Sequence, residues 1–163
     1  MRKGFTLVEL VVVIMIMGIL VAGYFYLTGA NVDTARVAKT QAIIEKAKKA
    51  IYTYYQDTGY FPTNAQQLWN NVLGTPGWYG PYVEAPNANP NLTYFPHAPW
   101  GGTMSIVCVD GTALKLTLDR MPQDLCSKLD QKIDDGSLTT GRVRWENNSC
   151  VYYVKTGAGV KCK

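Results

Sequence analysis

An uncharged apolar segment near the N-terminus constrains this sequence more than any other feature. Residues 10–27, LVVVIMIMGILVAGYFYL, carry no charge and consist mostly of Val, Ile, Leu and Met. A helix of about 20 such residues is long enough to cross the hydrocarbon core of a bilayer. We therefore expect a membrane-spanning helix, and Arg2 and Lys3 should keep its N-terminus in the cytoplasm. The charge of Glu9, at the edge of this segment, is costly there unless it has a partner.

The helix is expected to continue beyond the membrane. A secretory signal peptide would be shorter, and a small-residue cleavage site, absent here, would follow it. Instead, apolar side chains recur at the three- and four-residue steps of an amphipathic helix. They are Ala35, Ala38, Ala42, Ile43, Ala47, Ala50, Ile51 and Tyr54. The pattern predicts one helix over about residues 5–57, ended by Gly59.

All four cysteines lie in the C-terminal third, the part expected outside the cytoplasm. They are Cys108, Cys126, Cys150 and Cys162. An even number of cysteines in an exported segment favours two disulfides. A zinc site is the alternative, but spacings of 18, 24 and 12 residues fit no usual ligand pattern. All three possible disulfide pairings remain open.

The remaining sequence reads as turns, short helices and hairpins. Residues 59–100 are rich in Gly, Pro and Asn, with a short helix expected near TNAQQLWNNVL, capped by Thr63 or Asn64. Two β-rich runs flank an Asp-Gly pair in TMSIVCVDGTALKLTL, and GRVRW and CVYYVK predict a second hairpin. A short helix, PQDLCSKLDQKI, separates the hairpins. The expected fold is α+β, with an antiparallel sheet covering the apolar stripe of the long helix.

Composition and motifs offer little support for catalysis, a cofactor or nucleic-acid binding. An apolar fraction of 47% with 17% charged residues excludes a disordered chain, and the formal net charge of +4 includes no basic block. His97 is the single histidine, and no nucleophile motif accompanies it. Asp130, Asp134 and Asp135 are weak calcium candidates without the EF-hand pattern.

The N-terminal motif carries a resemblance to a known family. KGFTLVELVVVIMIMGILVA, residues 3–22, resembles the class III signal peptide and first helix of type IV pilins and type II secretion pseudopilins. The resemblance implies that a prepilin peptidase cleaves between Gly4 and Phe5 and that the new amine of Phe5 is methylated. It also implies an assembly role for Glu9, whose carboxylate would face the Phe5 amine of a neighbouring subunit.

The head also resembles pilins, through shorter motifs. PWGG before the strands and MPQDLC at the short helix are similar to the type IVb class, and LDQKIDDGSLTTGRVR is similar to a segment near the C-termini of pilin-like proteins. The resemblance implies the type IV pilin fold. It divides the chain into a leader (residues 1–4), a transmembrane and assembly segment (5–30) and a periplasmic or extracellular head (31–163).

The function implied is that of a structural subunit and not of an enzyme. The chain would enter the inner membrane, be processed, and polymerise into a helical pilus filament through its apolar helix. Its implied partners are the prepilin peptidase and an inner-membrane platform with its ATPase. A pseudopilin of a type II secretion system is the alternative, and a monomeric, membrane-anchored periplasmic binding domain is the remote one.

Overall fold

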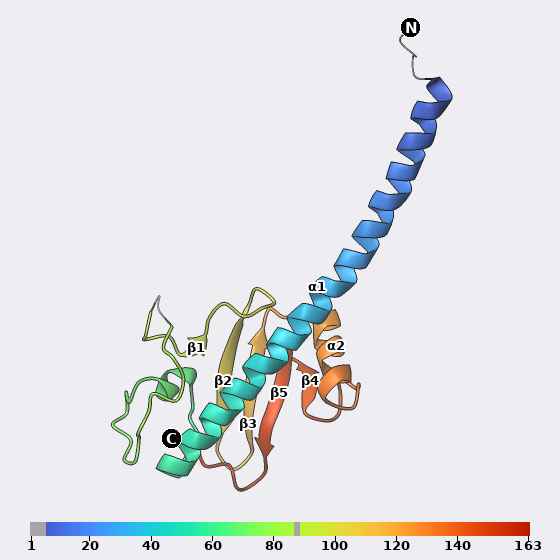
Figure 1. Ribbon diagram of the computed structural model, residues 1–163. Coiled ribbons are helices and arrows are strands. Elements are labelled where there is room, and N and C mark those ends of the chain that lie inside the picture. Colours follow the sequence, from blue (N-terminus) through green and yellow to red (C-terminus); the bar gives the residue numbers. More distant parts are fainter. Residues whose placement is uncertain (1–5, 87–88) are drawn as a thin grey trace. The chain divides into compact units, whose positions relative to one another are not determined.

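The computed structural model describes residues 6–86 and 89–163, without the side chains of residues 25–31. The chain divides into two compact units between Ala35 and Arg36, and we call the second unit the head. Helix α1 begins in the first unit and ends in the head, which holds all the other described elements (Figure 1). The elements are α1 (Leu7–Thr58), η1 (Ala65–Leu68), β1 (Tyr94–Phe95), β2 (Thr103–Val109), β3 (Ala113–Asp119), α2 (Gln123–Ile133), β4 (Val143–Glu146) and β5 (Ser149–Thr156).

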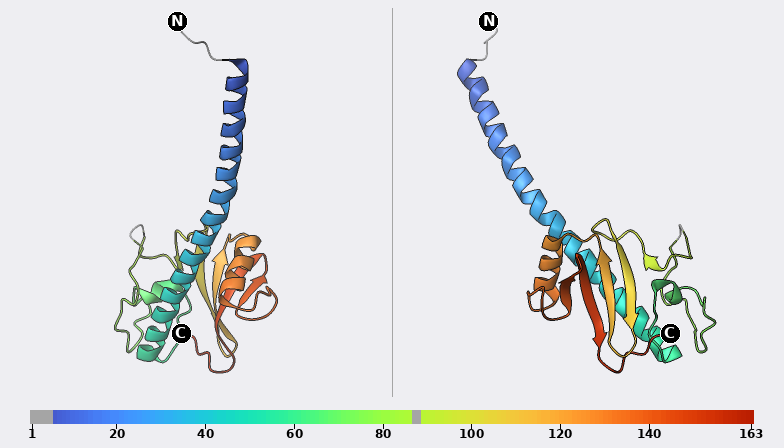
Figure 2. Two further views of the ribbon diagram at one scale, coloured as in Figure 1. Left: turned by 45° about the vertical axis from the view of Figure 1, so that its right-hand side comes forward. Right: turned by 180° about the vertical axis from the view of Figure 1, so that it is seen from behind.

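The head is built on one antiparallel sheet of five strands in the order β1-β2-β3-β5-β4. Leu114, Leu116 and Leu118 alternate with Lys115 and Thr117 along β3, so one face of the strand is apolar and the other polar. The second half of α1 lies across the apolar face (Figure 1). Seen from behind, no helix of the described chain covers the other face (Figure 2). The α+β architecture with a long N-terminal helix, expected for the pilin fold, is therefore confirmed.

The helix packs on the sheet through a face that the sequence analysis placed only in part. Ala47, Ala50, Ile51 and Tyr54 are buried as expected. Three of the alanines expected on this face, Ala35, Ala38 and Ala42, are exposed instead. The buried face continues toward the N-terminus through Val37, Thr40 and Ile44. Alanine is small and apolar enough to suit either face of a helix, so the larger Val37 and Ile44 were the better guides.

Both hairpins form where the sequence predicts them. Asp110 and Gly111 lie in the turn between β2 and β3, and Gly111 has a positive φ of 69°. Asn147 and Asn148 connect β4 to β5 with φ angles of 48° and 62°, the left-handed conformation that asparagine tolerates. The short helix also forms, as α2, with Pro122 immediately before it.

Three elements differ from the prediction in their bounds, type or presence. Helix α1 is described from Leu7 to Thr58, against a prediction of about 5–57; residue 5 lies outside the described residues. The predicted helix near TNAQQLWNNVL is a single 3-10 turn, η1, in which Asn64 and Gln67 form a capping box. The two-residue strand β1 lies in a stretch that the sequence analysis treated as loop, because so short a strand has no period to detect.

Two disulfides connect distant parts of the head, and they show which of the three possible cysteine pairings the chain adopts. Cys108 on β2 is bonded to Cys162 near the C-terminus, and Cys126 on α2 to Cys150 on β5. The expectation of two disulfides is confirmed, and no free cysteine remains. The first bridge holds the C-terminal segment against Phe61, whose N–H donates to the Lys161 carbonyl at 2.7 Å.

Candidate functional site

The first part of α1 presents an exposed apolar surface. Residues Leu7–Tyr24 form an 18-residue stretch long and apolar enough to cross a membrane, and none of it is buried. The exposed fraction of Leu7 is 81%, and that of Ile19 is 74%. Contiguous apolar surface of this extent is typical of lipid contact or of packing against other chains.

Glu9, the charged residue at the edge of this surface, has a local role that the sequence analysis missed. The N–H of Glu9 donates to Thr6 Oγ1 at 3.3 Å, and the N–H of Thr6 donates to Glu9 Oε2 at 3.5 Å. This reciprocal pair is a capping box, which satisfies two N–H groups at the start of α1. The T-x-x-E spacing in TLVE was the available signal. Gly4 and Phe5, the predicted cleavage site, lie outside the described residues.

The three aspartates named as calcium candidates come together at the end of α2. One carboxylate oxygen from each of Asp130, Asp134 and Asp135 lies within 4.8 Å of the others. Asp130 is fully buried, and neither of its carboxylate oxygens accepts a hydrogen bond. The Gly136 N–H lies near the Asp130 carboxylate and acts to lower its pKa, but the two groups do not have the geometry of a hydrogen bond.

The other two carboxylates organise the loop that leads into β4. Asp134 Oδ2 accepts from the N–H groups of Arg142 and Val143. Asp135 accepts from the Thr140 hydroxyl at 2.7 Å and the Ser137 N–H at 2.9 Å, and these two bonds lower its pKa. Burial, and then the charges of Asp135 and Asp134, raise the pKa of Asp130. The cluster thus concentrates negative charge around one desolvated carboxylate, as a cation site does.

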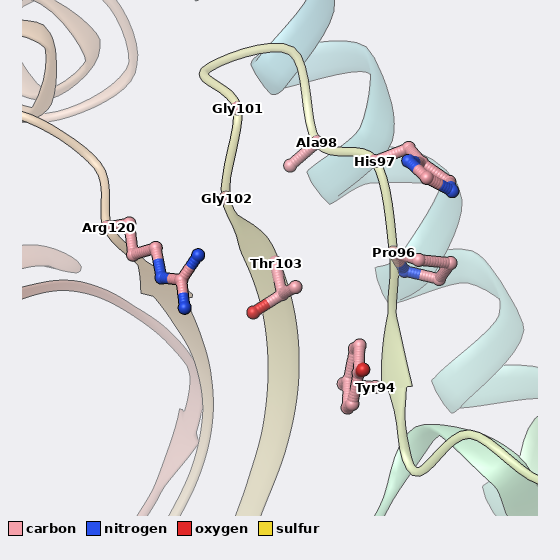
Figure 3. Close-up of a pocket in the computed structure, with 8 residues that line it drawn as sticks. All are labelled: Tyr94, Pro96, His97, Ala98, Gly101, Gly102, Thr103 and Arg120. Carbon is pink, nitrogen blue, oxygen red and sulfur yellow. The ribbon is translucent and has the colours of Figure 1, made fainter.

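His97 lies beside a surface hollow of about 450 Å³ between β1 and β3. Figure 3 shows the Arg120 side chain extending toward Thr103, while the His97 ring lies on the other side of its own segment. His97 and Arg120 have positive φ angles of 57° and 60°, uncommon for such residues. The hollow contains no cysteine or carboxylate that could complete a catalytic group with His97.

An ionic network on the helix-free face of the sheet was not expected from the sequence. Tyr153 donates its hydroxyl to Glu146 Oε1 at 2.6 Å, and Lys115 Nζ lies 3.3 Å from Glu146 Oε2. The Tyr153 hydroxyl, followed by Lys115, lowers the pKa of Glu146. The guanidinium of Arg144 lies 4.8 Å from the centroid of the Tyr153 ring. These residues come from three strands, so only the strand register brings them together.

The chain is similar to proteins of secretion systems and pili. A family profile described as the prokaryotic N-terminal methylation motif matches residues 1–25. The type II secretion system core protein G of Xanthomonas campestris pv. campestris is 32% identical over 118 residues, which cover 71% of this chain and 76% of that protein. The protein of the same name from Klebsiella michiganensis is 32% identical over 106 residues, covering 65% and 73%.

A third relative is a fimbrial protein of Neisseria meningitidis. It is 42% identical over 87 residues, which cover 52% of this chain and 49% of the relative. No solved structure gives a significant match. None of the three relatives is named as an enzyme.

Proposed function

Because the chain belongs to the family of type IV pilins and type II secretion pseudopilins, we propose that it is the structural subunit of a type IV pilus-like filament. The observation that carries the proposal is the apolar surface of Leu7–Tyr24, in which no residue is buried. Lipid can cover it before assembly, and the same helices of neighbouring copies can cover it in a filament. The role requires no catalysis and no organic cofactor.

Processing at the N-terminus would prepare the chain for assembly. A prepilin peptidase would cut between Gly4 and Phe5, and the exposed amine of Phe5 would be methylated. Thr6 and Glu9 would remain in the processed chain, so the helix cap would persist. The carboxylate of Glu9 would then accept the Phe5 amine of a neighbour, a pairing available only in the filament. Such a pair would fix the axial position of each subunit.

The proposal also divides the chain among compartments and partners. Residues 1–4 would be the leader, residues 5–30 the membrane and assembly segment, and residues 31–163 the exported head. The processed chain would wait in the inner membrane until a platform protein and its ATPase drive assembly. Disulfides in the head suit an oxidising compartment outside the cytoplasm.

A pseudopilin of a type II secretion system is the second candidate. It is favoured by the similarity to two core G proteins, which covers about three quarters of the Xanthomonas protein. Both candidates use the same helix and the same processing, and differ in whether the filament leaves the cell surface. A monomeric, membrane-anchored binding domain is the remote alternative, because it gives Glu9 no role in assembly.

The acidic cluster adds a cation site to the proposed subunit. Asp130, Asp134 and Asp135 would hold a divalent cation such as Ca²⁺, which binds oxygen ligands at about 2.3–2.6 Å. Two such ligands lie at most about 5 Å apart, which accommodates the observed 4.8 Å. The cation would neutralise the buried Asp130 and hold the end of α2 to the start of β4.

The proposal is tested by locating the assembled chain. The native cells are sheared, and filaments from the surface fraction are compared with the washed envelope by immunoblotting and electron microscopy. Surface filaments built from this chain support a pilus subunit. Filaments confined to the periplasm support the pseudopilin. A detergent-soluble monomer, without filaments in either fraction, contradicts both.

A further inference from the structure

The positive charge of the chain is concentrated at its C-terminal end. Residues 142–163 contain five lysines or arginines and one acid, Glu146, a net charge of +4. This equals the formal net charge of the full sequence, so residues 1–141 are neutral overall. A local excess of this kind indicates an anionic partner more directly than the total charge does.

Three of these cations line one surface hollow of about 250 Å³. Arg142 immediately precedes β4, Arg144 lies on β4, and Lys155 lies on β5 with its ammonium over the Tyr55 and Phe61 rings. The paired part of β4 ends opposite Tyr152, and beyond it the Tyr153 N–H donates to the Arg142 carbonyl at 2.7 Å. The rest of β5 therefore extends past β4, and the hollow lies at this open edge. Most of its lining is polar.

Arg144 is held in place at the hollow without being neutralised. Arg144 donates its Nε to the Gly141 carbonyl at 2.9 Å and lies over the Tyr153 ring. Two acids lie beside the hollow: the Glu146 carboxylate is occupied by Tyr153 and Lys115, and Asp134 Oδ2 accepts from the N–H groups of Arg142 and Val143. Asp135 is close enough for the charge of Arg144 to act on it, but it makes no ion pair with Arg144. Across residues 6–86 and 89–163, no carboxylate forms an ion pair with any of the three cations.

The surroundings of the hollow argue against a nucleic acid or a protein as its ligand. Single strands of nucleic acid bind to basic surfaces with their bases stacked on free aromatic faces. Here Arg144 and Lys115 lie over the Tyr153 ring. Tyr55 and Phe61 stack on each other at 4.3 Å, with Lys155 over both. A protein partner would also need apolar contact area, which the polar lining does not offer.

We infer that this hollow binds an acidic polysaccharide through its carboxylate or sulfate groups. Arg142, whose carbonyl continues the pairing with β5, is two residues before Arg144 on β4, a separation of about 6–7 Å for an extended backbone. Cations repeated along an extended strand suit a polymer that repeats its own charges. Guanidinium groups bind carboxylate and sulfate oxygens with two parallel hydrogen bonds. The inference is independent of whether the filament is a pilus or a pseudopilus.

The test measures binding by the full-length chain in a nonionic detergent. Fluorescently labelled polygalacturonate and dextran sulfate are titrated, with neutral dextran and single-stranded oligothymidine as further probes. We expect at least one acidic polysaccharide to bind, with an affinity that falls as salt rises, and neutral dextran not to bind. The double variant Arg142→Gln, Arg144→Gln should weaken that binding by roughly tenfold or more.

A matched variant controls for the loss of two charges. Lys39→Gln with Lys49→Gln removes the same charge from exposed positions of α1, and its binding should stay within about twofold of wild type. The single variant Arg142→Gln covers the case in which the double variant misfolds, because the Arg142 side chain makes no hydrogen bond or ion pair with the described residues of the head. Equal losses in both double variants, no loss in either, or no binding of either acidic polysaccharide would overturn the inference. Tighter binding of oligothymidine that is lost in the Arg142→Gln variant would reassign the hollow to nucleic acid.

Discussion

At the scale of single residues, Glu9 has two roles, of which the sequence analysis recognised only the pairing of its charge. Its carboxylate accepts the Thr6 N–H, so it already has a partner within its own chain. A capping box requires an acceptor at this position but not a charge, since glutamine serves as well as glutamate. A pairing with a neighbouring amine, by contrast, requires the charge.

Two substitutions separate these requirements. Thr6→Ala removes the cap acceptor and should fray the start of α1, at a cost of about 1 kcal/mol, while filaments still assemble. Glu9→Gln keeps the cap but removes the charge, and it should reduce the yield of sheared filaments severely. The yield is measured by immunoblotting against the total amount of the chain. Normal assembly of the Glu9→Gln variant would limit Glu9 to helix capping.

Asp130 is the second residue whose environment makes a clear prediction. Its pKa in the folded chain is raised above the ordinary value of 3.8, because the ionised form is buried beside two other carboxylates. The ionised group is therefore less favourable in the folded than in the unfolded state. The stability that its protonated form contributes is fully present below pH 3.8 and is lost as the pH rises through the higher folded pKa.

Asp130→Asn should remove this penalty. In chelator at pH 7 the free energy of unfolding of the variant should be higher than that of wild type, because the amide carries no charge to be desolvated or repelled by Asp135 and Asp134. Ca²⁺ should raise the melting temperature of wild type but not of Asp130→Asn. Asp124→Asn, at an exposed position in the first turn of α2, is the control. A variant less stable than wild type in chelator would show that Asp130 is stabilising as a carboxylate.

At the scale of elements, the two disulfides act on different connections. The bridge Cys108–Cys162 closes a 54-residue loop and holds the C-terminal segment, whereas Cys126–Cys150 closes a 24-residue loop and joins α2 to β5. Loop entropy in the unfolded chain gives about 4 and about 3 kcal/mol respectively.

Removing each pair by alanine substitution should therefore have distinct local effects. Loss of Cys108 and Cys162 should expose the C-terminal segment to carboxypeptidase and hydrogen exchange while α2 stays protected. Loss of Cys126 and Cys150 should open α2 and leave the C-terminal segment protected. The result is read by hydrogen-exchange mass spectrometry. Equal exposure of both regions in the two variants would contradict this division.

Features set by residues close together in the sequence could be predicted, whereas features set by contacts between distant residues could not. The leucine alternation of β3 and the asparagine turn after β4 are local signals, and both hairpins form as expected. Ala38 and Ala42 were misplaced because alanine does not define a helix face. The disulfide pairing, the Asp130 burial and the basic hollow depend on contacts between distant elements. A single sequence contains no direct signal for those contacts.

At the scale of the whole molecule, the chain consists of an apolar helical segment and a disulfide-linked head with different surroundings. In the proposed subunit, lipid or other copies of the chain cover the surface of Leu7–Tyr24. The head has its own core and carries the acidic cluster and the basic hollow on its loops and sheet edge. A head that is stable by itself can vary its surface while the helix keeps one mode of assembly.

The most direct test of this account is the intact mass and N-terminal sequence of the chain in sheared surface filaments. The account predicts a chain that begins with N-methylated Phe5 and is lighter by two hydrogens for each of its two disulfides. The same processed chain found only in the envelope would favour the pseudopilin. A chain that still carries Arg2 and Lys3 would contradict the processing, and with it the proposal that Glu9 pairs with a free amine in a filament.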